Sequence, residues 1–161
     1  MRGVGELFGW CCAGLLTCVT LACGGPEVVF AQSQDFGAPG WAYADSVSYA
    51  YTITDTSRLY DLVLTVDHAE DFAYQNFYVR LDTYLPDGRH LSQPLSLELA
   101  DHFGQWYGDC DGGRCRTDIS IQEGVRFNLP GEQRLVVTQF SREDPLPAIF
   151  GMGYRVIVSA E

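Results

Sequence analysis

The 161-residue chain contains no lysine, and all ten of its basic residues are arginine. It has 21 acidic residues, which leaves a formal net charge of −11 at pH 7. A surface with such an excess of negative charge repels the phosphate backbone of nucleic acids. The composition therefore argues against nucleic-acid binding.

Catalytic motifs are also missing from the sequence. It has no G-x-S-x-G nucleophile elbow, no H-E-x-x-H zinc motif and no G-x-x-x-x-G-K phosphate loop. His68 and His102 each follow an aspartate, but neighbouring residues on a strand face opposite ways and do not form a catalytic pair. No spacing singles out a carboxylate pair for glycoside hydrolysis. We therefore predict no active site and no cofactor.

No apolar run matches the roughly 20 residues that a comfortable membrane span needs. The run Leu7–Leu21 follows a basic start at Arg2 and ends in small residues, as a secretory signal does. Leu21-Ala22-Cys23 resembles the lipobox of bacterial lipoproteins, in which the signal is cut before the cysteine and its thiol is acylated. Cys18 fits this motif less well. The alternatives are an ordinary secretory signal with an unrelated cysteine, or an uncleaved anchor.

Three segments follow from this interpretation. Residues 1–22 are predicted to be a lipoprotein signal peptide, residues 23–40 a lipidated cysteine with a flexible tether, and residues 41–161 a folded domain. The tether is rich in Gly, Pro, Gln and Ser and shows no periodicity. Its alternative is that residues 28–31, VVFA, pair as an edge strand.

From Trp41 onward, apolar and polar residues alternate with the period of two that half-buried strands show. In residues 47–53 one face holds Val47, Tyr49, Tyr51 and Ile53. A tight turn at Pro86-Asp87-Gly88 predicts a hairpin, and Pro94 in its second strand predicts an edge or a bulge. About eight short strands and no long amphipathic helix predict an all-β fold, a β-sandwich of jelly-roll or immunoglobulin-like architecture.

Cys110 and Cys115 are the two cysteines of the mature chain besides the lipidated Cys23. Two of the four residues between them are glycine, so the loop can bend to bring the sulfurs together. Disulfides persist outside the inner membrane, and we predict a structural disulfide here. The spacing is not that of a C-x-x-C redox motif. A zinc site has only His102 nearby as a further ligand, and Asp109 and Asp111 lack the ligand series of a calcium loop.

Aromatic residues beside strands and loops offer a second kind of site. The candidates for a sugar-binding platform are Trp41, Tyr43, Trp106 and Tyr107. A platform that uses Trp106 and Tyr107 would make the domain a carbohydrate-binding module. The competing interpretation is that such rings close the ends of the sandwich, because aromatic side chains dominate core burial.

Five ordered stretches resemble the gliding motility-associated lipoproteins of the GldH family, from the phylum Bacteroidota. They are ITDTSRLYDL, YLPDGR, LADHFGQWYG, VRFNLPG and REDPLPAIFGMGYRV. The resemblance covers residues 41–158. Two features depart from the family pattern: the insert DCDGGRC, and Ala148 where the resemblance implies glycine.

The resemblance implies a non-enzymatic lipoprotein needed for gliding and linked to type IX secretion. It implies a lipid anchor at Cys23, in the outer membrane and facing the periplasm. Its partners would be other gliding motility or type IX secretion proteins of the envelope. We expect the partner surface around residues 101–107 and 144–150, whose candidate contact residues are Trp106, Tyr107, Asp144 and Leu146. The carbohydrate-binding module remains the alternative.

Overall fold

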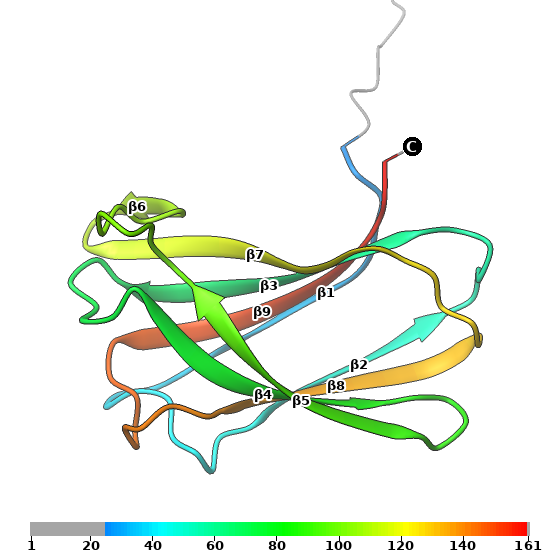
Figure 1. The fold of residues 1–161 in the computed structure, drawn as a ribbon, viewed down its shortest axis with the longest axis horizontal. Coiled ribbons are helices and arrows are strands. Elements are labelled where there is room, and N and C mark those ends of the chain that lie inside the picture. The colour runs from blue at the N-terminus through cyan, green and yellow to red at the C-terminus, as the bar shows by residue number, and fades with distance from the viewer. Residues whose placement is uncertain (1–24, 161) are drawn as a thin grey trace, which may run out of the picture.

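The computed structural model describes residues 25–160, which form nine β-strands in two sheets (Figure 1). The strands are β1 (Val28–Asp35), β2 (Val47–Ile53), β3 (Tyr60–Ala69), β4 (Asn76–Tyr84), β5 (His90–Glu98), β6 (Asp109–Asp111), β7 (Arg114–Val125), β8 (Gly131–Gln139) and β9 (Ile149–Val158). None of the described residues forms a helix that is long and apolar enough to cross a membrane. The predicted all-β sandwich is confirmed.

Both sheets are antiparallel throughout. One has the strand order β1-β9-β3-β7-β6 and the other the order β2-β8-β4-β5. The core lies between them, and strands such as β2 and β3 direct alternate side chains into it. On β2 the predicted inward face is the observed one, since Val47, Tyr49, Tyr51 and Ile53 are all buried. Period-two alternation therefore identified the core face of this strand.

The turn at Pro86-Asp87-Gly88 joins β4 to β5 as predicted. The Leu85 amide donates to the Arg89 carbonyl, and Gly88 takes a φ of 84°, in the left-handed region that favours glycine. Pro94 lies on β5, which is the edge strand of its sheet. An edge strand tolerates proline because one side of it forms no ladder hydrogen bonds.

The N-terminal part of the described chain differs from the prediction. Residues 28–35 form β1 and pair with β9, so the flexible tether predicted for residues 23–40 is wrong over this stretch. Phe30 explains why the strand forms: its ring packs against those of Tyr49, Tyr51 and Tyr154 in the core. The predicted signal peptide and Cys23 lie outside the described residues.

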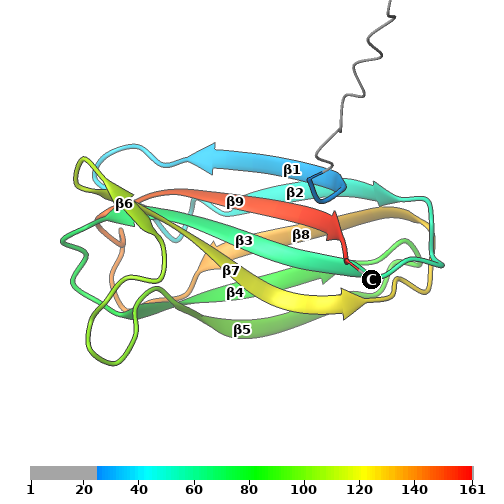
Figure 2. The same ribbon diagram turned by 90° about the horizontal axis from the view of Figure 1, so that it is seen from above.

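The sandwich has two ends (Figure 2). At the proximal end β1 begins and β9 ends, and the connections 54–59, 85–89 and 126–130 close it. The distal end carries the connections 36–46, 70–75, 99–108 and 140–148. Both segments predicted to bind a partner therefore lie at the distal end.

Candidate functional site

The distal connections are tied to one another by backbone hydrogen bonds. Trp41 and Leu146 exchange two of them, at N–O distances of 3.0 and 2.8 Å. The Ala69 amide donates to the Ala148 carbonyl at 2.9 Å, which links the end of β3 to the start of β9. The Tyr107 amide donates to the Leu99 carbonyl at 2.9 Å. The loops at this end are therefore held in place by the sheets and by each other.

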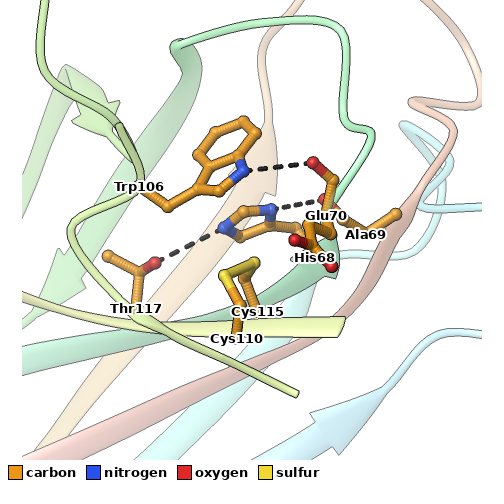
Figure 3. The surroundings of a disulfide bond; sticks show 7 residues. All are labelled: His68, Ala69, Glu70, Trp106, Cys110, Cys115 and Thr117. Atoms are coloured by element: carbon orange, nitrogen blue, oxygen red, sulfur yellow. Dashed lines mark hydrogen bonds between the residues drawn. A yellow bond between two sulfur atoms is a disulfide. The ribbon is translucent and has the colours of Figure 1, made fainter. Parts of the chain in front are cut away.

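His68 lies at the centre of the distal end. Its Nδ1 is 2.8 Å from the Ala69 carbonyl oxygen, and its Nε2 is 3.4 Å from the Thr117 hydroxyl (Figure 3). The carbonyl accepts from the Nδ1–H, and the Thr117 hydroxyl is placed to donate to Nε2, which fits the neutral ring. Burial lowers the pKa of His68, so the neutral form is also the form that the surroundings favour.

Trp106 covers the imidazole of His68, with 4.6 Å between the ring centroids. Its indole N–H donates to the Glu70 carbonyl at 3.1 Å, and its backbone bridges to Ala100. The side chain is half-buried. Trp106 therefore holds the 99–108 loop against the end of β3, and part of its ring is buried in this contact.

Cys110 and Cys115 form a disulfide across the β6–β7 hairpin. Cys115 is the cross-strand neighbour of His68, and the imidazole lies between the indole ring and the disulfide (Figure 3). Gly108 brings the loop down onto β7. A Cβ at this position would collide with the Arg116 carbonyl oxygen and the Thr117 hydroxyl. The bridge and the glycine together fix the path of the loop that carries Trp106 and Tyr107.

The four predicted contact residues differ in their access to solvent. Leu146 is 1% exposed and packs in the core, so its prediction as a contact residue is wrong. It is buried because its backbone pairs with that of Trp41, which brings both side chains inside. Asp144 is exposed, and its carboxylate accepts a 2.8 Å hydrogen bond from the Tyr43 amide. Tyr107 is 64% exposed.

Sequence reasoning named Tyr43 among the aromatic candidates but missed other exposed aromatic residues at this end. Phe103 is 84% exposed, and its ring lies beside that of His102. Tyr43 donates from its hydroxyl to the Ser141 carbonyl, and Tyr74 donates to the Glu143 carboxylate. We call the following set the distal aromatic surface: Tyr43, Tyr74, Tyr78, Phe103, Tyr107 and Phe140. The alternation along β4 contained one signal, since Tyr78 falls on the face opposite to Phe77 and Val79.

These side chains suit binding better than catalysis. Both ring nitrogens of His68 have partners, and Trp106 covers the ring. Within residues 25–160, no group of three or more His, Cys, Asp or Glu side chains is placed to hold a metal ion. Tyr and Phe are enriched at protein–protein interfaces, where their large rings supply contact area at low entropic cost.

The two packed antiparallel sheets place the described residues in the class of β-sandwich proteins. The chain belongs to the GldH lipoprotein family, whose model matches residues 28–156. It is similar to a gliding motility lipoprotein GldH homolog from Christiangramia forsetii. The two are 22% identical over 123 residues, which cover 72% of this chain and 76% of that protein. The family predicted from the five sequence stretches is confirmed.

Proposed function

We propose that this chain is a lipid-anchored, non-enzymatic accessory protein of the bacterial gliding motility machinery, linked to type IX secretion. It acts through contacts with other envelope proteins of these systems. Membership of a lipoprotein family and the motility role in the name of the Christiangramia forsetii relative support this proposal. The lipobox-like Leu21-Ala22-Cys23 supports an acylated Cys23 as the anchor, in the outer membrane and facing the periplasm.

The observation that carries the contact mechanism is the position of the distal aromatic surface. Val28, the first residue of β1, is the fifth residue after Cys23, and five residues span at most about 18 Å. The proximal end is therefore held near the membrane. The ten residues of β9 add about 33 Å along the sandwich. The exposed rings at the distal end are thus presented away from the anchor, where an envelope partner can reach them.

The test is a double substitution, Phe103→Ser with Tyr107→Ser, in cells of the host. Both residues are exposed, so the fold and the protein level should not change. We expect gliding to be lost, together with the proteins that crosslink to a tagged copy and are identified by mass spectrometry. The matched control is Leu59→Ser, an exposed apolar residue at the proximal end, which should leave gliding and crosslinks unchanged.

Two results would contradict the proposal. One is normal gliding in the double variant at equal protein level. The other is binding of purified envelope glycans by the full chain, abolished by Tyr107→Ser, with no envelope protein recovered by crosslinking. That second result would favour the carbohydrate-binding module.

A further inference from the structure

A cavity of 360 Å³ opens between the two sheets at the proximal end. It is lined by residues of both sheets, among them β5 and β7, and by the connections 85–89 and 126–130. Its size falls in the range of about 300–1,000 Å³ that small-molecule sites occupy. Its apolar lining includes Leu62, Leu81, Leu95, Ile121, Phe127 and Leu135.

One residue that lines this cavity has a buried polar atom without a partner among the described residues. Gln133 lines the cavity from β8 and is 1% exposed. Its Nε2 donates to the Leu129 carbonyl at 3.4 Å, whereas its Oε1 accepts no hydrogen bond from any described residue. Leaving a buried acceptor unpaired costs about 1–3 kcal/mol. A ligand that carries a hydroxyl group would supply the missing donor.

The opening of the cavity combines apolar surface with positive charge. Leu91 on β5 is 56% exposed and extends the apolar lining outward. Arg126 is exposed at the opening and donates to the Ser57 carbonyl, but it forms no ion pair with the described carboxylates. Arg89, which also lines the opening, is paired with Asp87. The chain has a net charge of −11, yet an arginine without an ion pair lies at this opening. Its positive charge favours an anionic group on the ligand.

We infer that the cavity binds a monoacyl glycerolipid with an anionic head group, the chemistry of a lysophospholipid. The acyl chain would lie among the apolar side chains, a glycerol hydroxyl would donate to Gln133 Oε1, and the phosphate would pair with Arg126. An ionised fatty acid has no hydrogen-bond donor for Oε1, and a diacyl phosphatidic acid has no free glycerol hydroxyl. With the proposed anchor at Cys23, this end faces the membrane that would supply such a lipid.

The binding test uses the full chain with Cys23→Ala, which carries no acyl group of its own. 1-Myristoyl-glycerol-3-phosphate is titrated below its micellar concentration and followed by calorimetry. We expect a Kd in the micromolar range. Myristate, which lacks the hydroxyl, and monomyristoylglycerol, which lacks the charge, should each bind about tenfold more weakly. Absence of binding up to about 1 mM, or equal affinity for all three probes, would overturn the inference.

Two substitutions test the assigned contacts. Gln133→Leu removes the unpaired acceptor and should weaken binding about tenfold while the protein remains folded. Arg126→Gln should weaken binding about fivefold, and less at 1 M salt, because the pair is exposed and screened. The control is Arg134→Gln, since the Arg134 guanidinium lies over the Tyr84 ring and does not line the cavity. Equal affinities in all three variants would contradict the assigned contacts.

Discussion

Strand β8 carries a buried glutamine towards each end of the sandwich, and the two have different surroundings. Gln139, at the distal end, donates from Nε2 to the Glu143 carbonyl at 2.6 Å and accepts at Oε1 from the Ser141 amide at 2.5 Å. Gln133, towards the proximal end, has only the 3.4 Å bond to Leu129, and its Oε1 is unpaired. Gln139 therefore satisfies backbone polar groups of the connection 140–148, whereas the Oε1 of Gln133 has no hydrogen-bond donor.

The contrast extends beyond these two residues. At the distal end, the disulfide, the His68–Trp106 contact and the close approach of Gly108 all restrict the same loop. At the proximal end the sheets leave a cavity between them. A braced end presents side chains in fixed positions, which lowers the entropy lost when a partner binds. An open end leaves volume and an unpaired polar atom for a ligand.

The largest expected effect comes from replacing each glutamine by leucine. Gln139→Leu removes the partners of the Ser141 amide and the Glu143 carbonyl, and should lower the free energy of unfolding by about 3 kcal/mol. Gln133→Leu removes the unpaired acceptor, which stabilises the fold, and also the 3.4 Å bond to Leu129, which destabilises it. Because the two effects oppose each other, the free energy of unfolding should change by less than about 1 kcal/mol. Urea denaturation of both variants measures the difference. Equal losses would show that the two ends do not differ in this way.

A smaller effect is expected from the titration of His68. Burial lowers the pKa of His68 below its ordinary value of 6.5, so the unfolded chain binds a proton that the folded chain resists. The contribution of His68 to the free energy of unfolding is therefore fully present above pH 6.5. It is lost as the pH falls below this value, by at most about 1.4 kcal/mol per pH unit. The depressed carboxyl groups, such as Asp61, act at lower pH because their ordinary values lie near 4.

The measurement compares urea denaturation of the wild type and His68→Gln at pH 7.5 and 5.5. The free energy of unfolding should fall more between these pH values in the wild type than in the variant. If the wild type and His68→Gln show the same difference, His68 does not supply the pH dependence.

Short sequence patterns predicted the parts of the fold that depend on residues close together in the chain. Alternation placed the side chains of β2 on the correct faces, and the Pro-Asp-Gly turn placed the β4–β5 hairpin. Alternation did not predict β1, because only its Phe30 packs against the core. The strand depends on pairing with β9, more than 110 positions away. Leu146 was misassigned for the same reason, since its burial depends on the backbone of Trp41.

The sequence predicts the loop over residues 101–107 as part of a partner surface because it is polar, aromatic and unlike a plain turn. The structure places this loop at the distal end, but its internal contacts do not follow from the sequence. Trp106 and Tyr107 are adjacent in sequence, yet one covers His68 and the other faces solvent. Which of two neighbours turns inward depends on the bridge to Ala100 and on a histidine from another strand. Sequence alone contains neither contact.

Ala148 offers the smallest and most local test of the distal end. Its φ is 62°, in the left-handed region, where a non-glycine residue is strained by about 1–2 kcal/mol. Its carbonyl accepts from Ala69, so the backbone cannot easily relax, and the GldH resemblance implies glycine at this position. Ala148→Gly relieves the strain but loses the packing of a partly buried methyl group and increases the entropy of the unfolded chain. The net expectation is a gain of about 0.5 kcal/mol in the free energy of unfolding.

Ala50→Gly is the control, at an exposed and extended position on β2, and it should lower the free energy of unfolding by about 0.5–1 kcal/mol. If both substitutions lowered the free energy of unfolding equally, the left-handed conformation of Ala148 would not be strained. The distal connections would then be held in place without backbone strain at this residue.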